Sequence, residues 1–338
     1  FADFAKNKML ELAKNTLADY GIVFDRWFSE KSLYNSGSVS KAVDHLTEKG
    51  LTCQDGGATW FKATKFGEEK DCVLKKSDGS FTYLAPDIAY HEDKFARGYD
   101  VLINILGQDH HGYSKRLKAT MEAIEFPADG LQIILYQLVQ IKQGEESVRM
   151  SKRKGTFETL SDIIDAVGTD VARFFYLNRK ASAHLVFDLS TALKKTEENP
   201  VYYIQYAFVR TKSIEEKAQA ISELADFLDS VNALEAAEGF DGKSFFVGSM
   251  SQCDIDVVKK ACSLKDILKL IEKTYQTHLL SYYAIELAKL FHNYYAKNRV
   301  VDPDNLEVSK IRLVIVRLVQ KTLHICLDLL GLDKPEKM

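Results

Sequence analysis

The sequence is poor in proline, in cysteine and in long uncharged apolar runs. Only 5 of its 338 residues are proline and 18 are glycine, and this scarcity of turn-forming residues favours long helices over an all-β fold. The five cysteines form no C-x-x-C pair, which argues against a zinc ribbon or a disulfide framework and indicates reduced thiols in a cytoplasmic protein. No apolar run reaches the length that crosses a bilayer, so we expect no membrane partner.

The remaining composition is that of an ordinary globular protein. Hydrophobic residues make up 46% of the chain and charged residues 28%, which excludes disorder or a collagen-like structure for the chain as a whole. Lysine and arginine number 45 and acidic residues 48, so that the net charge is −3. A total this close to zero identifies no partner, although it is compatible with a local basic face that binds nucleic acid.

The spacing of apolar residues changes near residues 190–200, where we place the main domain boundary. Before it, the patterns predict helices over 1–20, 38–50 (with Ser38 or Ser40 as N-cap) and 114–124, strands and turns over 51–83, a strand buried on both faces over 100–106, and a helix or a strand over 131–141. After it, the predicted helices cover 200–236, 254–300 and 307–330. The sequence thus predicts an α/β part followed by an all-α part.

One short segment concentrates four cations around a serine. Arg149, Lys152, Arg153 and Lys154 lie within a few residues of Ser151. A loop of this composition can place a lysine ammonium on a polyphosphate and neutralise the charge that develops there. The alternative is a solvent-exposed basic loop or a targeting patch. Composition alone favours that alternative, because short basic runs are common.

A second group of polar side chains follows directly after the predicted strand over 100–106. It comprises Gln108, Asp109, His110 and His111. Ligands bind at the carboxyl ends of strands in parallel sheets, and packing explains such a group poorly. A metal site is the alternative, but adjacent histidines rarely face one ion and no third ligand stands out. We therefore predict no metal here.

The third motif combines one carboxylate with two phenols. Tyr83, Asp87 and Tyr90 share one face of a helix if Asp87 opens that helix. A carboxylate flanked by phenols can receive a guanidinium or an ammonium through charge-assisted hydrogen bonds and cation–π contact. An N-cap aspartate beside two half-buried tyrosines explains the same pattern equally well.

The fourth motif opens the all-α part. Pro200 suits the first position of a helix, and Tyr202, Tyr203 and Tyr206 follow it. Three tyrosines this close cannot all face the core, so we expect at least one ring at the surface, where a nucleic-acid base could stack on it. An amphipathic helix with partly buried tyrosines is the alternative.

Together and in this order, the four motifs resemble those of the bacterial-type arginyl-tRNA synthetases, which are class I aminoacyl-tRNA synthetases. The resemblance covers essentially the whole chain. It implies an α/β plus all-α fold, in which a partial Rossmann-like parallel sheet precedes a helical anticodon-binding domain. The implied segments are a connecting insertion over 1–82, the second half of the catalytic domain over 83–195, and the anticodon-binding domain over 196–338.

The resemblance also implies roles for individual residues. The residues that match the arginine site are Tyr83, Asp87, Tyr90 and Gln108. Those that match the ATP site are Gly107, Asp109, His110, His111 and Lys152. The basic segment matches the family's catalytic KMSKS loop through Arg149, Met150, Ser151, Lys152 and Arg153, and Lys152 is the lysine that stabilises the pyrophosphate leaving group. The residues that match tRNA contacts are Tyr202, Tyr203, Tyr206 and Arg210.

The implied activity is ATP-dependent activation of L-arginine to arginyl-adenylate, followed by transfer to tRNA(Arg). ATP enters as its Mg²⁺ complex, and we expect no permanently bound cofactor. We expect a monomer in the cytoplasm whose partners are tRNA(Arg), L-arginine and ATP.

One motif of the family is missing. Class I synthetases contact ATP through a HIGH-type motif, and none occurs in these 338 residues. The family's N-terminal tRNA-binding domain is missing as well. The chain therefore resembles the C-terminal part of the enzyme, and we expect it to be inactive alone. The alternative is a non-catalytic tRNA-binding or interaction protein derived from a synthetase. Another class I synthetase or a nucleotidyltransferase fits the pair Tyr83 and Asp87 less well.

Overall fold

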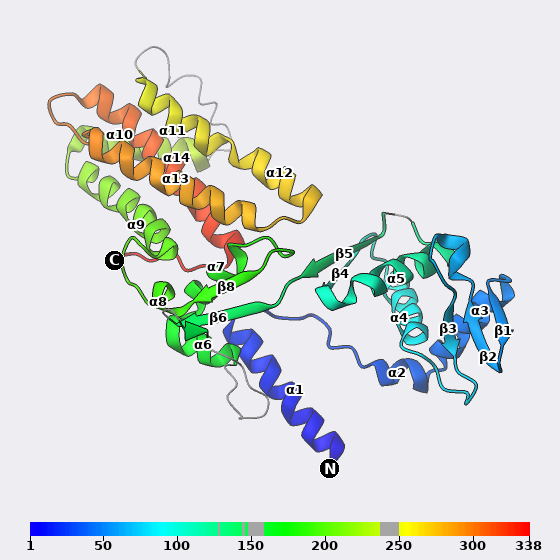
Figure 1. Cartoon of the computed structure of the whole chain (residues 1–338). Coiled ribbons are helices and arrows are strands. Elements are labelled where there is room, and N and C mark those ends of the chain that lie inside the picture. The colour runs from blue at the N-terminus through cyan, green and yellow to red at the C-terminus, as the bar shows by residue number, and fades with distance from the viewer. Residues whose placement is uncertain (128, 144–145, 148–158, 237–249) are drawn as a thin grey trace. The chain divides into compact units, whose positions relative to one another are not determined.

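The computed structural model describes the chain except for residues 128, 144–145, 148–158 and 237–249 (Figure 1). The described residues form two compact units. The small unit comprises Phe24–Leu138 and Ala181–His184. The large unit comprises Phe1–Val23, Val139–Lys180 and Leu185–Met338. These units do not coincide with the three segments expected from the sequence, and that three-part division stays a prediction.

The first half of the small unit is a helical pair beside a small antiparallel sheet. Its elements are α2 (Glu30–Asn35), α3 (Ser38–Glu48), β1 (Thr52–Asp55), β2 (Ala58–Phe61) and β3 (Cys72–Lys75), and the strands pair in the order β1-β2-β3. The helix over 38–50 and the strands over 51–83 are thus confirmed. The predicted N-cap of α3 is wrong, because Gly37 caps it with φ of +72°, a conformation that glycine adopts without strain.

The second half of the small unit is a βα arrangement around two parallel strands. Its elements are α4 (Leu84–Ala96), β4 (Leu102–Gly107), α5 (His111–Ala123) and β5 (Leu131–Tyr136), with a 3-10 turn η2 at Gln108–His110. Strands β4 and β5 pair in parallel along their whole length. This register places the polar group that follows β4 at the carboxyl end of both strands.

Strand β4 is buried on one face only, which corrects the expectation of two buried faces. Leu102 is 6% exposed, whereas Ile103 is 46% exposed and Ile105 is 65% exposed. Asn104 points to the covered face, where it bonds His91 of α4. No described element of the small unit covers the face that carries Ile103 and Ile105. The apolar run was a correct signal for a strand, but it did not report how many layers cover it.

The large unit begins with α1 (Ala2–Asp19), as the sequence predicted, and none of the residues of α1 is buried. A small sheet follows, in the order β7-β6-β8, formed by β6 (Val139–Gln143), β7 (Glu146–Ser147) and β8 (Leu185–Asp188). Strand β6 runs antiparallel to β7 and parallel to β8. The ambiguous run over 131–141 therefore forms two strands, β5 and β6. Three short helices accompany this sheet, namely α6 (Leu160–Val167), α7 (Thr169–Leu177) and α8 (Leu189–Ala192).

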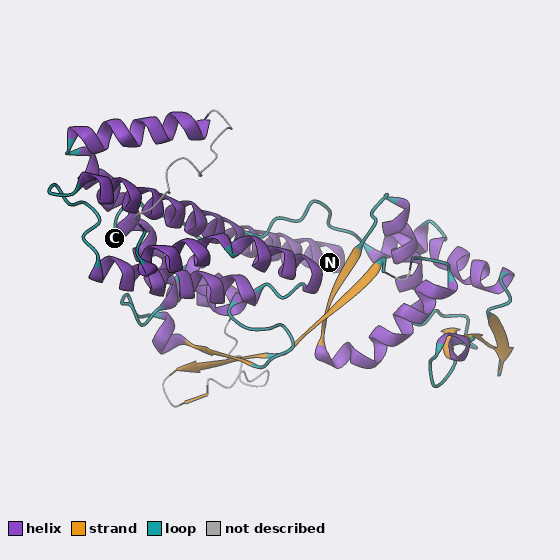
Figure 2. Cartoon of the chain, turned by 90° about the horizontal axis from the view of Figure 1, so that it is seen from above, coloured by secondary structure: helices purple, strands orange, loops and turns teal. Residues whose placement is uncertain are grey.

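Long helices make up the rest of the large unit (Figure 2). They are α9 (Pro200–Gln219), α10 (Ser222–Ala236), α11 (Gln252–Cys262), α12 (Leu264–Thr274), α13 (His278–Lys297) and α14 (Leu306–Leu330). Helices α9, α13 and α14 pack against one another around the core of this unit. The predicted helix over 254–300 is in fact three helices, and α12 ends where Tyr275 adopts φ of +56°. Pro200 is the first residue of α9, as expected, and the side chain of Asn199 caps the helix.

The five cysteines are free thiols. Among the described helices, none is both long enough and apolar enough to cross a membrane.

Candidate functional site

A pocket of 530 Å³ lies in the small unit where α4 and α5 begin. Both helices follow elements of the unit's sheets, so the pocket sits beside the carboxyl end of β4. Its lining residues are Glu30, Tyr83, Pro86, Asp87, Asp109, His110, Gly112, Tyr113 and Arg116. The pocket therefore brings together members of the second and third sequence motifs, which lie more than twenty residues apart.

Helix α4 sets the positions of Tyr83 and Asp87. The helix begins at Leu84 with Tyr83 as its N-cap residue, and Asp87 lies in its first turn. The expectation that Asp87 opens the helix is therefore wrong. Residues four apart lie on the same helix face, and both side chains line the pocket. The positive end of the helix dipole also favours a carboxylate at this position.

Tyr113 is a further residue of the site that the sequence analysis missed. Its hydroxyl donates a hydrogen bond to Oδ2 of Asp87, and its ring meets that of Tyr83 edge to face, with centroids 5.1 Å apart. Burial raises the pKa of Tyr113, and the Asp87 charge and the hydrogen bond raise it further. The phenol therefore stays protonated and remains a donor. Its place one residue after Gly112, in the first turn of α5, was the only signal in the sequence.

A buried polar network lies behind the pocket and holds the first turns of α4. Nδ1 of His91 lies 2.7 Å from the carbonyl oxygen of Asp87, and Nε2 lies 2.8 Å from Nδ2 of Asn104. The ammonium of Lys94 donates to Oδ1 of Asn104 at 3.3 Å. Because that oxygen accepts, Nδ2 donates to Nε2 of His91. Nδ1 of His91 therefore carries the proton and donates to the Asp87 carbonyl.

Burial lowers the pKa of His91, whose side chain is almost fully enclosed. The imidazole is therefore neutral at neutral pH, which agrees with the tautomer that its hydrogen bonds require. The network ties α4 to β4 through the hydrogen bonds that Asn104 makes with His91 and with the Lys94 ammonium, and the His91 bond to the Asp87 carbonyl holds the turn that carries Asp87.

Tyr90 is placed differently from Tyr83. It does not belong to the pocket lining. Its ring stacks on Phe28, with centroids 4.4 Å apart, and the Lys94 ammonium lies 4.2 Å from its centroid. A contact of Tyr90 with substrate stays a prediction.

Only some of the polar residues that follow β4 line the pocket. Asp109 and His110 line it, whereas Gly107, Gln108 and His111 are not among its lining residues. A Cβ atom at Gly107 would come within 2.5 Å of Oδ1 of Asp109, so a larger residue would displace the Asp109 carboxylate.

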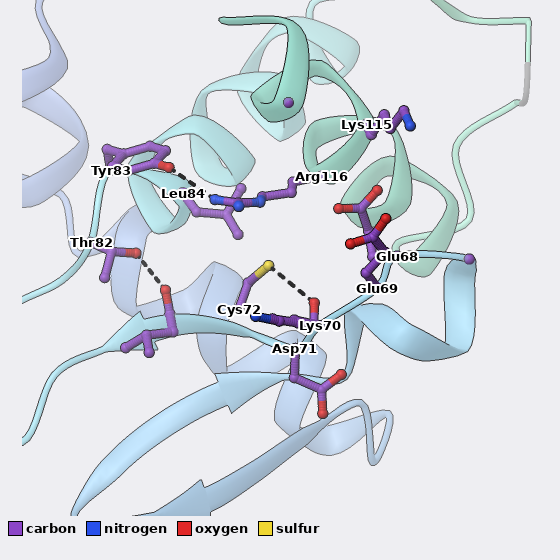
Figure 3. Close-up of a pocket in the computed structure, with 13 residues that line it drawn as sticks. Glu68, Glu69, Lys70, Asp71, Cys72, Thr82, Tyr83, Leu84, Lys115 and Arg116 are labelled. Atoms are coloured by element: carbon purple, nitrogen blue, oxygen red, sulfur yellow. Dashed lines mark hydrogen bonds between the residues drawn. The ribbon is translucent and has the colours of Figure 1, made fainter.

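A second pocket of 620 Å³ adjoins the first (Figure 3). The two share Tyr83, Gly112 and Arg116, and Nη1 of Arg116 donates to the Tyr83 hydroxyl at 3.4 Å. The second pocket is lined by acids and bases together, namely Glu68, Glu69, Lys70, Asp71 and Lys115. Such a mixed lining selects no single charge. The first pocket also combines acids with Arg116, but it alone contains the Asp87 carboxylate that accepts from Tyr113, so it is the more specific site.

The residues of the KMSKS-type segment, Arg149, Met150, Ser151, Lys152 and Arg153, lie outside the described residues. Their predicted role in catalysis stays a prediction.

An aromatic and cationic cluster occupies one side of α9 and α13 in the large unit. The guanidinium of Arg210 lies 4.5 Å from the ring centroid of Tyr206 and 5.0 Å from that of Tyr295. The His292 ring stacks on Tyr206, with centroids 5.6 Å apart. Tyr206 is 44% exposed, whereas Tyr203 packs against the helical core. Sequence analysis identified Tyr203, Tyr206 and Arg210 but not the two residues from α13.

The hydrogen bonds of this cluster fix the state of His292. Nη1 of Arg210 lies 3.3 Å from Nδ1 of His292, and a guanidinium can only donate. Nε2 of His292 therefore carries the proton and donates to the Tyr203 carbonyl at 3.2 Å. Burial lowers the pKa of His292, and the charge of Arg210 lowers it further. The cluster thus presents one cation and several uncharged rings. Tyr202 lies outside it, half-buried against the core.

Comparison with protein families first defines the class of this fold. The family model described as the catalytic domain of class I tRNA synthetases (R) matches residues 5–183. The DALR anticodon binding domain matches residues 204–338. The chain therefore combines a class I synthetase catalytic domain with a helical anticodon-binding domain, which confirms the predicted fold class.

Individual relatives narrow the class to one family. The chain is 40% identical over 338 residues to arginine–tRNA ligase 1 of Halalkalibacterium halodurans, covering 100% of the chain and 58% of that protein. It superposes with a TM-score of 0.83 on a crystal structure assigned as an arginyl-tRNA synthetase from Campylobacter jejuni, at 34% identity, covering 100% of the chain and 70% of that structure. The Thermus thermophilus arginyl-tRNA synthetase shares the fold at a TM-score of 0.75 and 19% identity, covering 98% of the chain and 63% of that structure.

The chain belongs to the arginyl-tRNA synthetase family, as its motifs had indicated. It spans 58% of the length of the curated relatives it matches.

Proposed function

We propose that this chain is the part of an arginine–tRNA ligase that binds the arginine side chain and the tRNA. The whole enzyme would join L-arginine to tRNA(Arg) in two steps. First, an oxygen of the arginine carboxylate attacks the α-phosphorus of ATP, and pyrophosphate leaves as arginyl-adenylate forms. Second, a hydroxyl of the terminal adenosine of tRNA attacks the adenylate carbonyl, and AMP leaves. Both steps depend mainly on positioning and on stabilisation of charge.

The observation that supports this proposal most directly is the carboxylate of Asp87, which accepts from the Tyr113 phenol and lines one pocket together with Tyr83. Tyr113 donates to Oδ2, which leaves Oδ1 and the second lone pair of Oδ2 free to accept. A guanidinium is planar and can donate two parallel hydrogen bonds to a carboxylate. An aromatic face such as that of Tyr83 adds a cation–π contact. The pocket therefore suits arginine better than lysine, whose ammonium is a point charge without the planar fork.

The remaining roles follow the resemblance. Asp109 and His110, which line the same pocket, are proposed to contact the adenylate together with Gly107 and His111. Gln108 is proposed to lie near the arginine, and Lys152 to neutralise the departing pyrophosphate. Mg²⁺ would enter with ATP and be held mainly by phosphates and water.

The tRNA-binding part of the proposal rests on the exposed ring of Tyr206 beside Arg210. Such rings stack on unpaired bases with little dependence on sequence. We propose that the anticodon loop binds here, with Tyr202, Tyr203, Tyr206 and Arg210 at or near the contact.

We further propose that the chain alone does not activate arginine, because it carries no HIGH-type motif to hold ATP.

Isothermal titration calorimetry of the chain with L-arginine and with L-lysine tests the arginine site. We expect arginine to bind and lysine to bind at least tenfold more weakly, since the two differ by one or more charge-assisted hydrogen bonds. Equal affinity for the two amino acids, or no binding of arginine, would contradict the proposed site.

A further inference from the structure

A pocket of 410 Å³ lies in the large unit where the C-terminal ends of α9 and α13 meet. Lys217 in the last turn of α9, Lys297 at the end of α13 and Arg299 just after it all line this pocket. Asn298 and Tyr295 supply further polar atoms. No carboxylate belongs to the lining, so the pocket carries a local positive charge in a chain whose net charge is −3.

Two of the three cations have no acidic partner among the residues that the structure describes. Other basic side chains of the large unit are paired, for example Lys310 with Glu307 at 2.8 Å. Neither Lys217 nor Lys297 makes such an ion pair, whereas Arg299 pairs with Asp302 at 3.2 Å. Two unpaired ammonium groups at the rim of a pocket without carboxylates favour an anion in that pocket.

A structural explanation also exists for the lysines. Cations in the last turn of a helix stabilise it by interacting with the negative end of the helix dipole. That explanation accounts for their positions along α9 and α13, but it does not account for a pocket between them. The two explanations predict different effects of substitution, because a capping lysine affects stability and an anion-binding lysine affects ligand affinity.

The pocket is continuous with the aromatic cluster through Tyr295. This residue lines the pocket and also packs under the guanidinium of Arg210, which in turn covers the ring of Tyr206. Tyr206 and Lys217 are eleven residues apart on α9, which is about three turns, or about 16 Å along the helix, and puts both residues on the same side of it. An exposed ring and a basic pocket along one side of a helix suit the alternating bases and phosphates of a single-stranded nucleic acid.

We propose that this pocket is a phosphate subsite, in which Lys217 and Lys297 hold a backbone phosphate of the tRNA strand whose base stacks on Tyr206. The proposal rests on the proposed binding of tRNA by the large unit and adds the ligand group and the residues that hold it. Stacking on Tyr206 contributes affinity without neutralising charge, whereas contact with the phosphate releases counterions. The two contacts are therefore separable by their dependence on salt.

The test measures the affinity of the full chain for a tRNA(Arg) transcript at several salt concentrations. In the double variant Lys217→Gln and Lys297→Gln, we expect the slope of log K against log[salt] to become shallower by roughly 0.7, the value for one phosphate on a single strand. In Tyr206→Ala, we expect weaker binding with the wild-type slope. The control variant Lys259→Gln and Lys289→Gln changes two exposed lysines of α11 and α13 outside the pocket and should keep the wild-type slope.

Two results would overturn the subsite. One is a double variant whose slope equals that of the wild type, even if its melting temperature falls, because that result assigns the lysines to helix capping alone. The other is an equal change of slope in the control variant, because binding would then depend on total charge. If the wild-type chain binds no tRNA at any salt concentration, the proposed function of the large unit fails, and the subsite fails with it.

Discussion

Replacing Asp87 by asparagine changes the charge of the proposed arginine pocket and almost nothing else. The side chains have the same shape, and the buried network of His91 holds the backbone of this turn, not its carboxylate. The Tyr113 hydroxyl, which donates to Asp87, can also accept from the asparagine amide. The amide oxygen would then still face the substrate. The substitution therefore converts charge-assisted hydrogen bonds into neutral ones without emptying the pocket.

The size of the effect follows from that conversion. A hydrogen bond to a charged group contributes about 1.5–3 kcal/mol and a neutral one about 0.5–1.5 kcal/mol. Two bonds from the guanidinium to the carboxylate therefore lose about 2–3 kcal/mol together, which is about 30- to 150-fold in the dissociation constant. Lysine, which makes no bidentate contact, should lose less, so that the preference for arginine shrinks.

Calorimetric titration of the wild-type chain and of Asp87→Asn with arginine measures this loss. Asp44→Asn is the matched control, because Asp44 is exposed on α3 and outside the pocket, and it should bind arginine as the wild type does. In a synthetase of full length, the same change should raise the KM for arginine and leave that for ATP nearly unchanged. A loss below about threefold, less than a single neutral hydrogen bond commonly contributes, would refute the assignment of Asp87.

Three further predictions concern stability and activity. Both tryptophans, Trp27 and Trp60, lie in the small unit, so their fluorescence reports its unfolding. Burial lowers the pKa of His91, so that below about pH 6.5 the unfolded state binds a proton that the folded state does not. The free energy of unfolding should therefore decrease as the pH falls below this value, by at most about 1.4 kcal/mol per pH unit. His91→Gln should flatten this dependence. Urea unfolding should show a loss of about 2–5 kcal/mol for Leu102→Ala but under about 0.5 kcal/mol for Ile105→Thr, since only the former is enclosed, and equal losses would contradict a strand covered on one face. Finally, arginine-dependent ATP–pyrophosphate exchange by the chain should not exceed a blank without protein, and turnover above it would disprove the proposed inactivity.

Local signals in the sequence located many of the elements, although not the breaks within 254–300, and they placed Tyr83 and Asp87 of the proposed arginine pocket on one face of a helix. Tyr83 and Asp87 share a face because they are four residues apart, and this holds although the helix begins one turn earlier than expected. Pro200 marked the start of α9 in the same way. Each of these inferences depends on neighbours within one or two helical turns, where spacing determines geometry.

Contacts between distant elements were not accessible in this way. Tyr113 lies 26 residues after Asp87, and nothing in its local pattern distinguishes a tyrosine that holds a carboxylate from one that packs in a core. The exposed face of β4 illustrates the same limit, because an apolar strand looks alike whether one layer or two layers cover it.

The cluster on α9 and α13 shows most clearly what the three-dimensional arrangement adds. Tyr206 and Arg210 are one turn apart on α9 and could be paired from sequence. His292 and Tyr295 belong to α13, which begins 68 residues after Arg210. Only packing of the two helices brings them against Arg210. In the folded protein the guanidinium of Arg210 contacts the rings of Tyr206 and Tyr295. The Arg210 side chain has therefore lost conformational freedom before any ligand binds. A guanidinium held in this way is preorganised for a base or a phosphate, so that less conformational entropy is lost on binding. The same packing also creates the pocket beside Lys217, which no pattern within a single helix could have indicated.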